Sequence, residues 1–120
     1  MLSSGSSKIP DSGDQLFSYA CGKAAMDAVS RNLASLWSIK YGVTVNSISV
    51  GATLTESLQL SFDMMGPEWK QYLENVSLLK RIGTVEEVAQ IVGFVASPQA
   101  SWITGNQIPA NGGGLSALQS

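Results

Sequence analysis

The chain has 120 residues, 44% of them hydrophobic, and a formal net charge of −2 at neutral pH. This length and composition are those of one globular domain with a core, and they exclude a disordered chain. The near-neutral charge provides no basic face for nucleic acid, and the sequence lacks the run of roughly 18 apolar residues that a transmembrane helix needs, so we expect neither nucleic acid nor a membrane as a partner.

The residue inventory limits the chemistry that the chain can perform. The single cysteine, Cys21, can form no disulfide within the chain, and residues 1–10 lack the apolar stretch of a signal peptide, so we expect a reduced, cytoplasmic setting. Histidine is absent, which excludes a Ser-His-Asp triad and histidine-based zinc sites, and we expect no metal site. Any catalysis must therefore use tyrosine, lysine, serine, a carboxylate or a bound cofactor.

The first half of the chain predicts a loop, a long helix and a strand. Serine and turn-forming residues up to about residue 18 indicate a loop that leaves a strand end at Met1-Leu2. Helical periodicity predicts a helix from Asp14 to Tyr41, ended by Gly42. Alternation of β-branched residues then predicts a buried strand over Val43 to Val50. Apolar residues at helical spacing are expected to form the buried stripe of the helix: Ala25, Met26, Val29, Leu33, Leu36 and Trp37.

The second half predicts shorter helices and a last extended segment. Residues 53–60 form a loop or a short helix after the strand, and Pro67 begins a helix that runs through about Val76. Thr84 and Glu87 match a capping box, which opens a helix to about Ser97. Gln107 to Ala110 is extended, and a turn of three glycines follows at Gly112 to Gly114. The inward side of the helix after Thr84 is expected to carry Val88, Ile91, Val92 and Val95.

Tyr19 and Lys23 stand four residues apart near the start of the long predicted helix. Side chains at this spacing share a helix face, with Cβ atoms about 5–6 Å apart. A protonated lysine favours the phenolate and so lowers the pKa of the tyrosine, which helps the phenol to exchange a proton near neutrality. The spacing alone is common, and an ordinary tyrosine one turn from a surface lysine explains it equally well.

Several short motifs follow one another in a characteristic order. They are Ser3-Ser4, Tyr19-x-x-x-Lys23-Ala24-Ala25, the strand-like run from Val45 to Gly51, Thr53-Leu54-Thr55, the run from Arg81 to Ala89, and Ile103 to Gln107 with Asn111-Gly112-Gly113. Together they span nearly the whole chain, which resembles the C-terminal half of a short-chain dehydrogenase/reductase. The resemblance implies an α/β fold: a partial Rossmann-like, doubly wound parallel sheet that lacks the first nucleotide-binding half, with residues 1–120 as a single segment.

The resemblance also implies catalytic roles. Tyr19 would be the acid/base that protonates a carbonyl oxygen as hydride arrives from the nicotinamide cofactor. Lys23 would hold the ribose hydroxyls of that cofactor and lower the pKa of Tyr19. A serine would hydrogen-bond the substrate oxygen. The paired serines favour Ser4, whereas the family's usual spacing to the tyrosine favours Ser6.

The same resemblance implies a cofactor and a substrate class. Besides Tyr19 and Lys23, the cofactor-binding positions would be Gly51 and Thr53 through their backbone and Thr55 through its hydroxyl. Thr55 could instead be a helix N-cap. The cofactor would be NAD or NADP, with NADP slightly favoured. The substrate would be a small-molecule ketone or secondary alcohol, with the 3-oxoacyl or polyketide kind favoured. The complete subunit of such an enzyme is expected to form a homo-oligomer.

The sequence departs from the family pattern in ways that favour an alternative. Val50, Gly22 and Asn111 stand where the family usually has proline, serine and aspartate. The glycine-rich turn that seats the diphosphate of the nucleotide is absent from the 120 residues. We therefore expect no robust turnover by the isolated chain. The alternative is a truncated, non-catalytic piece of the fold or an interaction module whose exposed helix stripe favours association.

Overall fold

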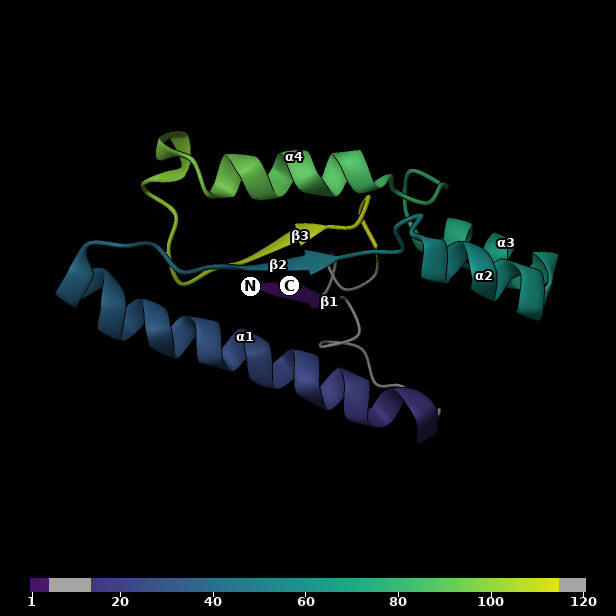
Figure 1. Ribbon diagram of the computed structural model, residues 1–120, viewed down its shortest axis with the longest axis horizontal. Helices are drawn as coiled ribbons and strands as arrows, with labels where there is room; N and C mark the ends of the chain where they lie inside the picture. The colour runs from purple at the N-terminus through teal and green to yellow at the C-terminus, as the bar shows by residue number, and fades with distance from the viewer. Residues whose placement is uncertain (5–13, 115–120) are drawn as a thin grey trace.

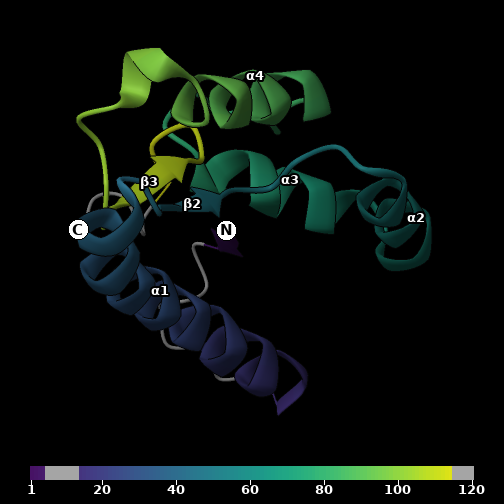
Figure 2. The same cartoon turned by 60° about the vertical axis from the view of Figure 1, so that its left-hand side comes forward.

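The computed structural model describes residues 1–4 and 14–114. Figure 1 shows a small sheet with the long helix α1 on one side and helix α4 on the other, and Figure 2 shows the same separation from another angle. In chain order the elements are β1 (Leu2–Ser4), α1 (Asp14–Tyr41), β2 (Ser47–Val50), α2 (Glu56–Met65), α3 (Pro67–Val76), α4 (Val85–Val95), the 3-10 turn η2 (Pro98–Ala100) and β3 (Gln107–Ala110).

The three strands form a parallel sheet in the order β1-β2-β3. Ile48 of β2 lies opposite Leu2 on one side and Ile108 on the other. Parallel sheets are normally covered by helices on both faces, and α1 and α4 do so here (Figure 1). The expected α/β fold with a partial doubly wound parallel sheet is confirmed.

The connection between α1 and β2 corrects the predicted strand Val43 to Val50. Gly42 ends the helix with φ of 66°, a left-handed conformation that suits glycine. The strand begins only at Ser47. Before it, the amide of Val45 donates to Thr104 Oγ1 over 3.1 Å, and the carbonyl of Val45 accepts from the amide of Gly105 over 2.8 Å. Val45 therefore contacts the loop that leads into β3, and the strand begins only after it.

The face that α1 buries differs from the predicted apolar stripe. Val29, Leu36 and Trp37 are 47%, 63% and 43% exposed, so the stripe mostly faces away from the sheet. Ala25 is also exposed, whereas Met26 and Leu33 are half-buried. Among the α1 side chains that the structure describes, from residue 17 onward, the buried ones are small or polar: Asp27, Ser30 and Ala34.

The physical reason lies in the sheet surface below α1. Gln107 lies in register with Ser47, so their side chains share one face of the sheet. On that face the side-chain amide of Gln107 donates to Asp27 Oδ2 over 2.7 Å. A polar sheet face thus selects a polar, small-residue side of α1, which a search for apolar periodicity does not find.

Helices α2 and α3 form a pair beyond the carboxyl end of β2 (Figure 1). Gly66, with φ of 86°, separates them, and α3 begins at Pro67 as predicted. The indole nitrogen of Trp69 donates to Ser61 Oγ over 3.1 Å, which ties the second helix to the first. The ring of Trp69 also stacks on Tyr72 with 5.8 Å between centroids.

Helix α4 begins at the predicted capping box and ends earlier than expected. Thr84 Oγ1 accepts from the Glu87 amide, and the Glu87 carboxylate accepts from the Thr84 amide. The helix ends at Val95, not near Ser97. Val92, expected on the inward side, is exposed, because the narrow sheet covers only part of the apolar side of α4. The other residues expected there, Val88, Ile91 and Val95, are half-buried. Among the described residues, none of the helices combines the length and apolarity needed to cross a bilayer.

Candidate active site at the carboxyl edge of the sheet

The carboxyl ends of the three strands lie side by side. Ser4 at the end of β1 is in register with Val50 of β2, and Val50 with Ala110 of β3. Segments that follow parallel strands therefore gather at one edge, where open α/β sheets bind their ligands. Among the described residues, the segments after β2 and β3 do so, beginning at Gly51 and Asn111.

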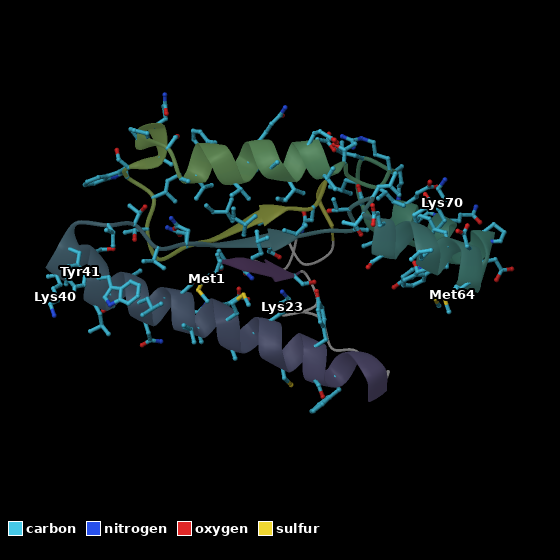
Figure 3. The ribbon with its side chains drawn as sticks, in the orientation of Figure 1. Met1, Lys23, Lys40, Tyr41, Met64 and Lys70 are labelled. Atoms are coloured by element: carbon cyan, nitrogen blue, oxygen red, sulfur yellow. The ribbon has the colours of Figure 1, made fainter. Side chains whose placement is uncertain are left out.

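Tyr19 and Lys23 lie together on α1, which packs against β1. The Lys23 ammonium is 5.5 Å from the centre of the Tyr19 ring, a cation–π distance. The same ammonium donates to the carbonyl oxygen of Leu2 over 3.2 Å (Figure 3 labels Lys23). Tyr19 is 47% exposed, so its phenol is accessible to a ligand. The helix thus carries a phenol and an ammonium to the side of the first strand.

The two serine candidates are placed differently. Ser4 is the last residue of β1 and is half-buried. Ser6 lies outside the described residues. Of the two serines, only Ser4 lies within the described residues, at the edge of the sheet where β2 also ends.

Gly51 leaves β2 in close contact with the chain that leaves β3. Its amide donates to the Ala110 carbonyl over 3.1 Å. A Cβ atom at Gly51 would lie 2.7 Å from Asn111 Cβ and 2.8 Å from Asn111 Cα, closer than real atoms approach. The glycine is required by this close packing of two backbones, whatever ligand the edge binds.

The two threonines after Gly51 are held by backbone contacts. Thr53 donates its hydroxyl to the Gly51 carbonyl over 2.9 Å and forms an isolated parallel bridge with Gly83. Thr55 is the N-cap of α2, since its Oγ1 accepts from the Leu58 amide over 3.2 Å. The N-cap alternative for Thr55 is confirmed. Its hydroxyl hydrogen can still be donated to a ligand.

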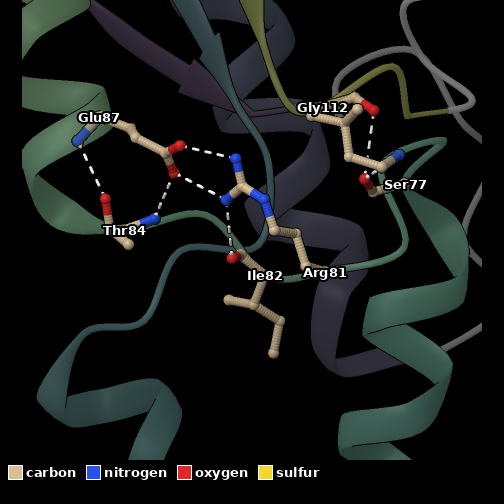
Figure 4. A network of polar contacts seen from close by, with 7 residues as sticks. Ser77, Arg81, Ile82, Thr84, Glu87 and Gly112 are labelled. Atoms are coloured by element: carbon tan, nitrogen blue, oxygen red, sulfur yellow. Dashed lines mark hydrogen bonds and ion pairs between the residues drawn. The ribbon is translucent and has the colours of Figure 1, made fainter.

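The turn after β3 is fixed by contacts that the sequence did not indicate. Asn111 Oδ1 accepts from the amides of Gly113 and Gly114, each over 3.1 Å. The carbonyl of Gly112 accepts from Ser77 Oγ over 3.1 Å and from the Leu79 amide over 3.3 Å (Figure 4). Two segments far apart in sequence therefore close on each other beside the candidate site.

An ion pair anchors the start of α4 (Figure 4). Arg81 Nη2 and Nη1 donate to Glu87 Oε1 and Oε2 over 2.6 and 2.9 Å, and the Thr84 amide donates to Glu87 Oε2 over 2.9 Å. The hydrogen bonds from Arg81, followed by the one from Thr84, lower the pKa of Glu87 to about 2. The pair is a bidentate contact of the kind that arginine forms with carboxylates.

The contact between Asp27 and Gln107 was not predicted from the sequence. Asp27 is one helical turn beyond Lys23 and is 5% exposed. Its backbone carbonyl accepts from Ser30 Oγ over 3.2 Å, and its carboxylate accepts from Gln107. A signal existed in the spacing of Lys23, Asp27, Ser30 and Ala34, which places small and polar residues along one side of the helix.

Comparison with known proteins places this geometry among relatives. The family model described as enoyl-(acyl carrier protein) reductase matches residues 2–114. A short chain dehydrogenase of Penicillium thymicola is 35% identical over 98% of this chain and 42% of its own length. The 7alpha-hydroxysteroid dehydrogenase of Escherichia coli is 35% identical over 84% of this chain and 38% of its own length. The chain thus spans about two fifths of the length of these relatives.

A solved structure shares the fold at similar coverage. An angucycline C-6 ketoreductase with bound NADP superposes with a TM-score of 0.82 at 28% sequence identity. The match covers 98% of this chain and 42% of the ketoreductase. The likeness therefore extends over nearly everything that the structure describes here.

Proposed function

The chain belongs to the short-chain dehydrogenase/reductase family, and we propose that it forms part of an NAD(P)-dependent oxidoreductase that interconverts a ketone and a secondary alcohol. The observation that carries this proposal is the Tyr19–Lys23 pair on α1, held against β1 by the contact of Lys23 with Leu2. The pair lies on the helix that precedes β2, and the carboxyl edge of the sheet gathers the other candidate residues.

The donors in the described residues suit the nicotinamide and ribose end of a dinucleotide. The ammonium of Lys23 suits ribose hydroxyls, and the Thr55 hydroxyl suits the carboxamide. Gly51 and Thr53 would border the ring through their backbone. The described segment that joins β2 to α2 has no glycine-rich turn for a diphosphate, so these residues fit one end of the cofactor. We favour NADP over NAD, supported by the NADP bound to the similar ketoreductase.

The chemistry divides between the cofactor and the chain. When bound, the nicotinamide supplies or accepts the hydride. Tyr19 gives its phenolic proton to the carbonyl oxygen in reduction and takes it back in oxidation, which its exposure permits. Lys23, whose ammonium lies 5.5 Å from the centre of the Tyr19 ring, would hold the ribose hydroxyls of the cofactor beside that phenol. Ser4 would orient the substrate by donating its hydroxyl to the same oxygen.

The helices beyond β2 bear on the substrate class. Leu60, Met64 and Met65 of α2 are exposed, so an apolar surface lies past the carboxyl end of β2. Trp69 is half-buried and engaged with Ser61 and Tyr72, which indicates a packing role. An apolar ketone, of the 3-oxoacyl or polyketide kind, would suit this surface, and the family model's description supports it.

Cofactor binding tests the assignment directly. NADPH and NADH are titrated separately into the 120-residue chain by calorimetry, with Lys23→Met and a matched control, Lys40→Met, which removes the same charge near the far end of α1. We expect weak binding that Lys23→Met lowers at least tenfold and Lys40→Met leaves unchanged. Equal binding by both variants would contradict the role of Lys23. Turnover is then compared with Tyr19→Phe in any assembly that shows activity, and an undiminished rate would contradict the role of Tyr19.

A second candidate function has its own observation. The exposed stripe of α1, with Val29, Leu36 and Trp37, is an apolar surface of the kind that binds other proteins. A non-catalytic interaction module, or a homo-oligomer formed through α1, would use it. Light scattering of the chain and of Leu36→Glu decides this: association that the charge abolishes supports an α1 interface, and a monomer at all concentrations excludes it.

A further inference from the structure

The turn after β3 contains the one Asn-Gly pair of the sequence, Asn111-Gly112. An asparagine that precedes glycine can lose its side-chain amide, because the backbone nitrogen of the glycine can attack the asparagine Cγ and close a cyclic imide. Glycine allows this close approach since it has no Cβ to obstruct it. The other asparagines precede leucine, serine, valine and glutamine. Asn111 is therefore the position at which this chemistry meets the least steric resistance.

The fold aims two donors at the oxygen of the Asn111 side chain. Oδ1 accepts from the amides of Gly113 and Gly114, each over 3.1 Å. Gly112, which carries the attacking nitrogen, has φ of 63°, and a Cβ there would lie 2.6 Å from Ser77 Oγ. None of the described residues accepts a hydrogen bond from the Gly112 amide. The position thus keeps a glycine, and no such bond holds its nitrogen away from Cγ.

We propose that Asn111 is a site of spontaneous deamidation, in which the amides of Gly113 and Gly114 act as an oxyanion hole. The Gly112 nitrogen loses its proton to water and forms a bond to Asn111 Cγ. The bond from Cγ to Nδ2 then breaks, and Nδ2 takes up a proton and leaves as ammonia. Water opens the imide at either of its carbonyls and leaves aspartate or isoaspartate, so no oxidant or reductant is needed. The modification stands independently of the proposed function.

The two hydrogen bonds to Oδ1 strengthen as the reaction proceeds. Before the attack they join neutral groups, whereas Oδ1 carries a negative charge once the Gly112 nitrogen has added to Cγ. Hydrogen bonds to a charged oxygen are roughly twice as strong as those between neutral groups. Donors already placed where the charge develops therefore lower the barrier. We expect Asn111 to react faster in the folded chain than in a flexible peptide of the same sequence.

The two products differ in what they do to the carboxyl edge of the sheet. A Cβ at Gly51 would lie 2.8 Å from Asn111 Cα, so the two backbones leave no spare room. Aspartate keeps this backbone and offers an oxygen to the same two amides. Isoaspartate adds a methylene group to the main chain, which disturbs the Gly51 contact or the bond from Ser77 to Gly112 (Figure 4). The isoaspartate form should therefore melt below the parent, and Asn111→Asp close to it.

The first test compares the folded chain with an unstructured reference. The 120-residue chain and a synthetic peptide of residues 107–114 are incubated in the same mildly alkaline buffer. Peptide mapping by mass spectrometry follows the conversion of each asparagine, and an isoaspartate-specific methyltransferase detects the second product. We expect Asn111 to react faster in the chain than in the peptide by a factor of about three or more. Asn46, which is buried, should stay unreacted.

A matched pair of variants at Gly114 isolates the contribution of an amide donor. Gly114→Pro removes the N–H that Oδ1 accepts. Gly114→Ala keeps it and places a Cβ at an ordinary contact distance of 3.6 Å from Asn111 Cγ. We expect the proline variant to deamidate about threefold more slowly than the alanine variant. Circular dichroism confirms that both are folded as the parent is.

Each outcome bears on the proposal. Reaction in the chain no faster than in the peptide overturns it, as do equal rates in the two Gly114 variants. Faster conversion of any other asparagine also overturns it. If Gly114→Pro does not fold, the comparison of chain and peptide decides alone. Cofactor binding is measured on freshly prepared, unreacted chain, so a failure to bind NADPH contradicts the proposed function and leaves the deamidation unaffected.

Discussion

The two faces of the sheet are packed by different physical means. On the α1 face, Asp27 contacts Gln107 through a directional hydrogen bond, and Ser47 on the same face is almost fully buried. On the α4 face, the strands present Ile48 and Ile108, which are in register with each other. One helix is therefore positioned by hydrogen-bond geometry and the other by apolar contact, and the first carries Tyr19 and Lys23.

The difference bears on how precisely each helix is placed. Apolar contact is non-directional, so a helix held by it can shift with small losses. A buried hydrogen bond is lost with even a modest rotation, and its unpaired groups then cost free energy. We infer that the bond to Asp27 fixes the rotation of α1, and with it the position of Tyr19, two helical turns earlier.

The largest effect is expected from the apolar face. Ile48→Ala removes a side chain that is 4% exposed, and we expect the free energy of unfolding to fall by about 3 kcal/mol. Urea denaturation followed by tryptophan fluorescence measures it. Because apolar contact depends on buried volume and not on a directional bond, Ile48→Val should retain most of the stability that Ile48→Ala loses. A Val variant as unstable as the Ala variant would show that this face is not held by simple burial.

The polar face should respond to geometry as well as to volume. Asp27→Leu leaves the half-buried Gln107 amide without the carboxylate that it contacts, and we expect a loss of about 2 kcal/mol. Asp27→Asn keeps an acceptor oxygen of similar shape and should lose about half as much. The same denaturation assay measures both. An Asp27→Leu variant as stable as the parent would contradict the claim that a hydrogen bond holds α1 to the sheet.

Acid should weaken the α4 side through Glu87. Its pKa is lowered from 4.5 to about 2, mainly by the hydrogen bonds from Arg81. A carboxylate with a lowered pKa contributes stability above its unfolded pKa, and that contribution is lost as pH falls through 4.5 toward 2. Melting temperatures of the parent and of Glu87→Gln should therefore converge across this window. A constant difference between them would contradict the assignment.

The smallest effect is expected where α4 and α1 face away from the sheet. Val92 and Val29 are both exposed, so Val92→Ser and Val29→Ser should each change the unfolding free energy by less than about 0.5 kcal/mol in the monomer. A larger loss for Val29→Ser that grows with protein concentration would instead locate an association surface on α1. Thermal melts at two concentrations distinguish the cases.

Local signals predicted much of the fold. The bounds of α1 and α3 and the capping box at Thr84 depend on residues within a few positions of one another, and all are confirmed. The start of β2 was wrong because Val45 contacts Thr104, 59 positions away. The buried side of α1 was wrong because the partner of Asp27 lies 80 positions along the chain.

The candidate site likewise combines features that local sequence predicts with contacts between distant segments that it does not predict. Tyr19 and Lys23 were found from their spacing and from the order of the motifs, and their common location on α1 is a local property. The contact of Lys23 with Leu2, and the packing of Gly51 on Asn111, depend on how distant segments meet. The roles of these residues with cofactor and substrate stay predictions.

The contact between Ser77 and Gly112 has a consequence for how the chain opens. The hydroxyl of Ser77 and the amide of Leu79 both donate to the Gly112 carbonyl. These hydrogen bonds join the two ends of the segment that contains α4, η2 and β3, with 35 positions between Ser77 and Gly112. Proteins open locally in contiguous cooperative units that often coincide with supersecondary motifs, and we expect this segment to be one of them. Amide hydrogens from α4 through β3 should accordingly exchange with solvent together. Ser77→Ala should raise the exchange rates in this segment more than those in α1.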